Sequence, residues 1–154
     1  MQEKLAKWLE EKELNFIAEL KVIKIGIKRI PDFLVLMPGY GLINIEAKCN
    51  NFDEMMRQLN DNAIFCNYSF AFIPDYSLTP KWFKVALLQS GYGLMVFNYK
   101  NDVITEVFEA HLNKGTDKEL QKFMIYKMNE YLIKRKKAKE VDTQQILQLN
   151  GTEY

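Results

Sequence analysis

Three ionic side chains lie close together in an otherwise apolar part of the chain. Asp32 precedes the apolar run Phe33–Met37, and Glu46 and Lys48 end a second apolar run that begins at Leu42. Burying a carboxylate among apolar strands costs free energy unless a partner compensates its charge. Two carboxylates beside an ammonium suggest a Mg²⁺ site, because Mg²⁺ takes one or two carboxylates and fills its remaining positions with water and phosphate oxygens.

The two apolar runs are predicted to form a hairpin. Each has the length of a strand, and they flank the turn sequence Pro38-Gly39-Tyr40-Gly41. Because strand side chains alternate between faces, Glu46 and Lys48 are expected to share one face at the end of the second strand. Whether Asp32 stands beside Glu46 depends on the register and twist of the sheet, which the sequence leaves open.

At these residues the chain resembles the PD-(D/E)xK nuclease superfamily, and the later run from Gly91 to Phe97 resembles a strand of small DNA-repair nucleases with this fold. The matching residues are Pro31-Asp32 and, after a short gap, Glu46-Ala47-Lys48 at a strand end. The resemblance implies that Asp32 and Glu46 bind a divalent metal, Mg²⁺ or Mn²⁺. It also implies that the Ala47 backbone carbonyl is a further ligand and that Lys48 positions or activates the attacking water.

Structural context separates this set from other matches to the same pattern. Glu-x-Lys also occurs at Glu10-Glu11-Lys12 and Glu19-Leu20-Lys21, and Pro-Asp recurs at Pro74-Asp75. The set around the predicted hairpin alone has both parts in order on consecutive strands, and a motif counts when its context agrees. The alternative is a hairpin with Asp32 in a turn and its acid–lysine end in solvent.

The resemblance adds two accessory candidates. The first core helix of the family often carries an acid that reaches the active site, which selects Glu3, and many members place a polar residue where Gln58 stands. Each also fits as a solvent-exposed side chain. Lys28 and Arg29 are candidate DNA contacts, because cations bind backbone phosphates, although a solvated hairpin end explains them equally well.

The pattern of apolar residues predicts an α/β order of elements. The expected helices cover residues 2–13, 51–65, 81–89 and 115–139, and the expected strands 15–24, 27–37, 42–49, 66–74, 92–99 and 103–110. The strand–helix–strand succession in the middle implies a right-handed crossover and a parallel strand pair. The resemblance implies a restriction-endonuclease-like fold, a three-layer α/β/α structure with a central mixed sheet and an α-β-β-β-α-β core.

Length and composition favour a single globular domain over residues 1–140, followed by a loose polar tail over 141–154. The chain has 154 residues, of which 48% are apolar, and a net charge of +1. This charge gives no global argument for nucleic acid, so such an argument must come from local patches.

Features of targeting predict a cytoplasmic protein with no membrane partner. Cys49 and Cys66 have no metal-ligand or redox spacing, which fits free thiols in a reducing compartment. The charged N-terminus does not resemble a signal peptide, and no apolar run has the length of a membrane span.

The resemblance implies a Mg²⁺-dependent deoxyribonuclease that hydrolyses phosphodiester bonds, with DNA as its partner. Cutting both strands or a junction would call for a homodimer with two sites. The sequence leaves open which form of DNA is the substrate and whether RNA takes its place. It also leaves open whether the enzyme is an endonuclease or an exonuclease. Two alternatives remain, namely a catalytically inactive nuclease-fold module for DNA binding or assembly, and a metal-free α/β protein that binds a small molecule or a protein.

Overall fold

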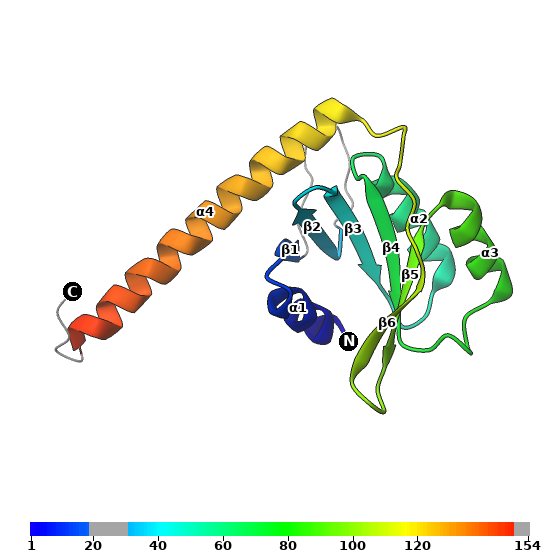
Figure 1. Ribbon diagram of the computed structural model, residues 1–154, viewed down its shortest axis with the longest axis horizontal. Coiled ribbons are helices and arrows are strands. Elements are labelled where there is room, and N and C mark those ends of the chain that lie inside the picture. The colour runs from blue at the N-terminus through cyan, green and yellow to red at the C-terminus, as the bar shows by residue number, and fades with distance from the viewer. Residues whose placement is uncertain (19–30, 150–154) are drawn as a thin grey trace.

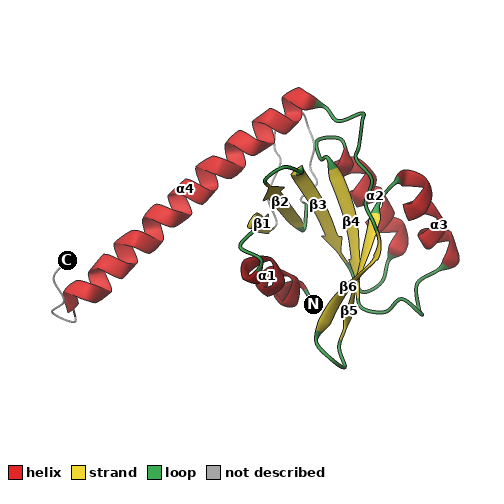
Figure 2. Cartoon of the chain, viewed as in Figure 1, coloured by secondary structure: helices red, strands yellow, loops and turns green. Residues whose placement is uncertain are grey.

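The computed structural model describes residues 1–18 and 31–149, and side-chain surroundings in the last helix as far as residue 136. Within these residues the chain folds into six strands and four helices of a mixed α/β structure (Figure 1 and Figure 2). The elements are α1 (Gln2–Glu11), β1 (Asn15–Ala18), β2 (Phe33–Met37), β3 (Gly41–Ala47), α2 (Phe52–Ala63), β4 (Tyr68–Ile73), α3 (Lys81–Ser90), β5 (Gly93–Asn98), β6 (Val103–Phe108) and α4 (Lys118–Leu149).

All six described strands lie in one sheet, in their order along the chain. β1, β2 and β3 pair antiparallel, β3, β4 and β5 pair parallel, and β6 returns antiparallel to β5. The parallel pairing of β3 with β4 confirms the crossover predicted from the strand–helix–strand pattern. The β2–β3 and β5–β6 hairpins are confirmed as well, so the sheet is mixed as expected.

Helices cover both faces of the sheet. On one face Phe33, Val35 and Ile45 pack against Leu5 and Leu9 of α1. The opposite face packs against α2 and α3 over β4 and β5, and against the first half of α4 over β1, β2 and β3. Because strand side chains alternate, every polar residue in the middle of β3 points into one of these two apolar layers.

A tight turn at Pro38–Gly41 fixes how β2 pairs with β3. The Tyr40 N–H donates to the Met37 carbonyl at 3.0 Å, and Gly39 and Gly41 have positive φ angles of 82° and 89°. Glycine takes such angles without the steric cost that a Cβ brings. The turn sets Met37 opposite Gly41, and this register continues along the whole hairpin.

α2 begins where the sequence predicts a helix cap. The Asn51 side chain accepts a hydrogen bond from the Glu54 N–H at 3.3 Å, which satisfies one of the unpaired donors of the first turn. Met55 and Leu59 of this helix are fully buried, as their spacing predicts.

The last helix is longer than the sequence predicts. The sequence predicts its end near residue 139 and a loose tail from 141, but α4 continues to Leu149. Segment 140–149 contains neither Gly nor Pro, and the next glycine is Gly151, so no residue there interrupts the helical hydrogen bonds. No helix in the described part of the chain combines the length and apolarity needed to cross a membrane.

Two predicted strands are described in part. Of the strand expected over 15–24, the structure describes Asn15–Ala18, and the remainder lies outside the described residues. The strand expected over 27–37 begins at Phe33 in the described part, so Asp32 directly precedes β2.

The turn that sets the hairpin register provides a stability test. A Cβ at Gly41 would collide with Asn67 Oδ1, which accepts hydrogen bonds from the Leu42 N–H at 3.0 Å and from Gln121 Nε2 at 2.7 Å. At Gly39 nothing lies within 4 Å of an added Cβ. We therefore expect Gly41→Ala to lower the free energy of unfolding more than Gly39→Ala does.

Both glycines have positive φ, so the backbone cost of roughly 1 kcal/mol is common to the two variants. The excess for Gly41→Ala should be about 1–3 kcal/mol, the cost of losing the partly buried hydrogen bonds to Asn67. Urea denaturation of both variants measures it, and equal destabilisation would contradict the assigned role of Asn67.

Candidate active site

The hairpin register brings Asp32 and Glu46 together. Phe33 pairs with Ile45, so one step outward Asp32 stands opposite Glu46 on the same face of the sheet. The Ala47 N–H donates to Asp32 Oδ2 at 2.8 Å, and the Asp32 N–H lies 3.4 Å from Glu46 Oε2. The register that the sequence leaves open is therefore the one that joins the two carboxyl groups.

Glu46 is a buried acid with a strongly perturbed pKa. Its side chain has no exposed surface. Burial, and next the negative charge of Asp32, raise the pKa of Glu46 from 4.5 to about 8, while a hydrogen bond from Asn62 acts in the opposite direction. The protonated form of Glu46 is therefore favoured near neutral pH, because burial and the adjacent Asp32 carboxylate both disfavour its negative charge.

Asn62 holds Glu46 from the helical side. Its Nδ2 donates to Glu46 Oε1 at 2.5 Å, and the residue is fully buried. Sequence reasoning missed Asn62, although it follows Met55 and Leu59 at the spacing of the apolar stripe of α2, where a polar residue is unexpected. The contact engages Oε1, while Oε2 lies on the side of Asp32.

Asn44 is a second buried amide on this face. It lies two residues before Glu46 on β3, pairs in register with Ser69 of β4, and has no exposed surface. Neither of its amide atoms has a hydrogen-bond partner in the structure. Buried polar atoms without partners are rare in native proteins, and ordered water commonly satisfies them, so this layer is more polar than the sequence pattern suggests.

Lys48 lies one step farther along the same face of the sheet. Its backbone N–H donates to the Phe72 carbonyl at 3.2 Å, which extends the β3–β4 ladder past the last residue of β3. Its Nζ forms an ion pair with Glu54 Oε2 at 3.6 Å. Lys48 thus lies on the same face as Glu46, as the alternation of strand side chains predicts, and its ammonium pairs with an acid of α2 that sequence reasoning did not consider.

The other predicted site residues fall in different places. Gln58 lies on α2 between Glu54 and Asn62 at intervals of four residues, and its Oε1 is buried without a partner in the structure, so it is more than a surface side chain. Glu3 is exposed on α1, which packs against the opposite face of the sheet. The structure does not bring it to the carboxyl pair.

The remaining expectations concern Ala47 as a metal ligand, two candidate DNA contacts and the two cysteines. Ala47 is buried at the end of β3, with its N–H on Asp32. Lys28 and Arg29 lie outside the described residues. The thiols of Cys49 and Cys66 are free, and burial, followed by the charge of Glu46, raises the pKa of Cys66.

The donor set at the pair fits a hard cation. Among the described residues no three His, Cys, Asp or Glu side chains gather into a metal-binding group. Mg²⁺ needs one or two carboxylates and keeps several waters, which the pair of Asp32 and Glu46 can provide. A divalent cation would also replace the proton that now relieves the repulsion between the two groups.

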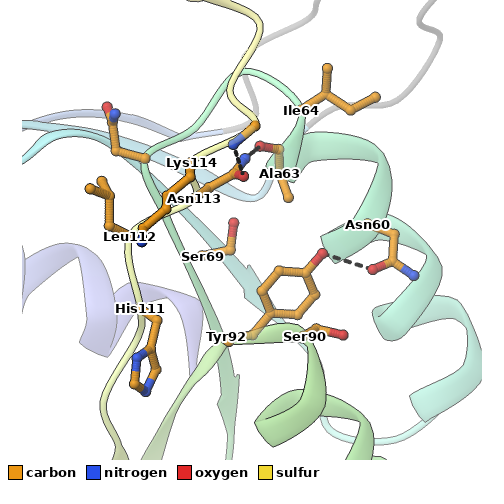
Figure 3. A pocket seen from close by; sticks show the side chains of 13 residues that line it. Asn60, Ala63, Ile64, Ser69, Ser90, Tyr92, His111, Leu112, Asn113 and Lys114 are labelled. Carbon is orange, nitrogen blue, oxygen red and sulfur yellow. Dashed lines mark hydrogen bonds between the residues drawn. The ribbon is translucent and has the colours of Figure 1, made fainter.

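A separate pocket of about 530 Å³ opens at the C-terminal end of α2 (Figure 3). Figure 3 shows the Tyr92 hydroxyl directed at Asn60, to whose Oδ1 it donates at 2.7 Å, and Ser69 on the same pocket wall. His111 and Lys114 line it as exposed residues. None of its described lining residues is acidic, so it offers no carboxylate to a divalent cation.

Comparisons with known proteins bear on the fold. A search of solved structures finds the SPO1766 protein of unknown function from Silicibacter pomeroyi, with 20% sequence identity, a TM-score of 0.62, and coverage of 89% of this chain and 86% of that chain. At this identity the similarity shows a shared fold and nothing about activity. No protein-family model and no curated protein matches the chain.

The protonated Glu46 predicts how stability depends on pH. The folded protein holds this proton up to a pKa of about 8, whereas the unfolded chain releases it near 4.5. The folded state binds more protons in this interval, so the free energy of unfolding should fall as the pH rises through it. Glu46→Gln, which imitates the protonated carboxyl group, should remove this dependence.

The test is urea denaturation of both proteins from pH 4 to 9 with EDTA present. The free energy of unfolding of wild type, relative to that of Glu46→Gln, should fall by a few kcal/mol up to about pH 8 and then level off. One pKa unit corresponds to about 1.4 kcal/mol. A difference that does not vary with pH would contradict the buried carboxyl pair.

Proposed function

We propose that the chain is a metal-dependent nuclease of the PD-(D/E)xK superfamily that hydrolyses phosphodiester bonds in DNA. The observation that carries this proposal is the contact between Asp32 and Glu46 across the end of the β2–β3 hairpin. The order of elements around them, α1-β1-β2-β3-α2-β4, agrees with the order expected for a restriction-endonuclease-like core.

Asp32 and Glu46 would hold the cation, with the Ala47 carbonyl as a further ligand by resemblance. A bound Mg²⁺ or Mn²⁺ would supply polarisation of the scissile phosphate and a lower pKa of a bound water. The protein supplies the rigid frame for these ligands, because the Ala47 N–H fixes the Asp32 carboxylate and Asn62 fixes that of Glu46.

Lys48 would provide the positive charge that the chemistry needs beside the phosphate. It leaves β3 on the same face as Glu46, and the ion pair with Glu54 keeps its ammonium near the end of the hairpin. A fixed cation stabilises negative charge that develops on the phosphate or orients the attacking water, and such preorganised groups contribute strongly to catalysis.

A catalytically inactive nuclease-fold module that binds DNA or supports an assembly is the second candidate. The Lys48–Glu54 ion pair favours it, because an ammonium that stays paired with Glu54 is less available to a substrate. The two candidates differ in the uptake of a divalent cation and in turnover, and both can be measured directly.

The nuclease proposal predicts the effect of three substitutions. Asp32→Asn, Glu46→Gln and Lys48→Met should each reduce Mn²⁺-dependent cleavage of labelled DNA at least about 100-fold, the scale for loss of one transition-state contact. Asp75→Asn is the matched control, because Asp75 belongs to the second Pro-Asp pair and forms an exposed turn with Ser77. It should retain full activity.

Calorimetric titration with Mn²⁺ separates the two candidate functions. The nuclease predicts binding heat for wild type and for Asp75→Asn, and little or none for Asp32→Asn. If wild type takes up no Mn²⁺ and cuts no form of DNA, the enzyme is excluded and the inactive module is favoured.

Asn62 should matter for the affinity of the cation. Asn62→Leu removes the donor to Glu46 Oε1, and loss of such a partner of a metal ligand typically weakens metal binding 10–100-fold. Asn60→Leu is the matched control on the exposed side of the same helix. A dissociation constant for Mn²⁺ that is unchanged in Asn62→Leu, with circular dichroism confirming the fold, would show that Asn62 does not orient Glu46.

A further inference from the structure

The near-neutral total charge conceals a strong separation of charge along the chain. α4 contains eight basic and four acidic residues, a formal net charge of +4. Segment 19–30 has four basic residues and one acid, and the remainder of the chain has nine basic and fifteen acidic residues. The chain outside these two segments is therefore acidic, with a formal charge of −6.

α4 carries its charge away from the domain. Leu120, Met124 and Met128 are buried against the sheet, and Leu132 packs at the margin of the same cluster. Beyond that point the helix continues as an arm, and its C-terminal end lies far from the sheet (Figure 1). With 32 residues, the helix is about 48 Å long at a rise of 1.5 Å per residue.

The beginning of the arm is basic around much of its circumference. Lys134, Arg135 and Lys136 are all exposed. Consecutive helical residues point about 100° apart, so these three side chains cover more than half of the helix surface. A helix that is polar on all sides gains little from packing on its own domain, so packing does not explain why charge is concentrated here.

A groove marks the place where the arm leaves the body. It has a volume of about 590 Å³ and lies between α1, β1 and α4, with Arg135 and Lys136 on one wall and Glu10 as its single described acid. Asn15 of the same groove pairs with Leu36. Leu36 of β2 lies four residues from Asp32, which directly precedes this strand. At 3.4 Å per residue this spacing corresponds to about 14 Å.

We propose that α4 is a DNA-binding arm, in which Lys134, Arg135 and Lys136 contact the phosphate backbone of a double helix. The proposal rests on the proposed nuclease function and names where its polyanionic substrate is held. An acidic body repels DNA, whereas a protruding row of cations attracts it and releases condensed counterions. Such contacts do not depend on the base sequence of the DNA, because they are made to phosphates and not to bases.

Exposed aromatic and aliphatic residues of α4 offer the competing explanation. Tyr126, Tyr131 and Ile133 are each about half exposed, which would suit an apolar protein partner. Such docking depends weakly on salt, whereas phosphate binding weakens steeply with it. DNA binding that weakens with salt and needs the cations of the arm therefore supports phosphate contacts, and its absence favours the apolar partner.

The test compares two triple variants of the full chain with the same change in charge. Lys134→Gln, Arg135→Gln and Lys136→Gln neutralise the arm, and Lys81→Gln, Lys100→Gln and Lys114→Gln neutralise three exposed lysines of the body. Fluorescence anisotropy with a labelled 20-base-pair duplex, in EDTA and over a series of KCl concentrations, gives the affinity and its salt slope.

The arm variant should bind at least about tenfold more weakly at low salt, and its salt slope should decrease by about 2–3, because each phosphate contact contributes about 0.9. The body variant should stay within about twofold of wild type. Equal losses in the two variants, an unchanged slope in the arm variant, or no binding by wild type would each overturn the proposal. A duplex RNA of the same length shows whether the arm distinguishes the two backbones.

Cleavage by wild type with Mn²⁺ is scored separately. Loss of binding in the arm variant without any cleavage by wild type would support the arm and contradict the nuclease. Cleavage by wild type together with unchanged DNA binding by the arm variant would support the nuclease and contradict the arm.

Discussion

The contact between the Asp32 and Glu46 carboxyl groups is the constraint on which the rest of the site depends. Two negative charges this close repel each other strongly where helices exclude water from the sheet. Burial, and next the charge of Asp32, raise the pKa of Glu46 to about 8, so a proton relieves the repulsion in the free protein. In the proposed nuclease a divalent cation would relieve it in place of the proton, so the geometry that costs stability in the free protein would favour metal binding.

The hairpin makes this contact reproducible. Because side chains alternate along a strand, a slip of one residue between β2 and β3 would turn Glu46 away from Asp32 and into the layer beneath α1. The positive φ angles of Gly39 and Gly41 and the hydrogen bonds to Asn67 oppose such a slip. The register is thus specified by turn chemistry six to nine residues along the chain from Asp32.

Much of the frame could be predicted from the sequence, because it follows from local rules. The turn at Pro38–Gly41, the cap at Asn51 and the crossover to β4 each depend on residues close in sequence, and all three agree with the structure. The partners Asn62 and Glu54 could not be predicted from the sequence, because each becomes a neighbour of the site only when α2 folds back along β3.

The end of the last helix shows a different limit. A basic run predicts a helix end because cations favour the C-terminus of a helix, but that preference is weak, and segment 140–149 offers no residue that stops the helix. The basic residues therefore lie within α4 and not at its end. Stabilisation of the helix dipole therefore does not explain them, because a cation in the middle of a protruding helix interacts only weakly with that dipole.

The distribution of charge then connects the arm with the carboxyl pair. A nuclease must bring a polyanion to two acids, and the acidic body around them opposes its approach. In the proposed nuclease a cation at Asp32 and Glu46 would reverse the sign of charge at the pair, but its field would be screened within about 10 Å at moderate salt. Positive charge at a distance must come from elsewhere, and in the described part of the chain the exposed row at Lys134 to Lys136 provides it. A total charge of +1 is thus compatible with a nucleic-acid substrate, because attraction depends on where the charges lie and not on their sum.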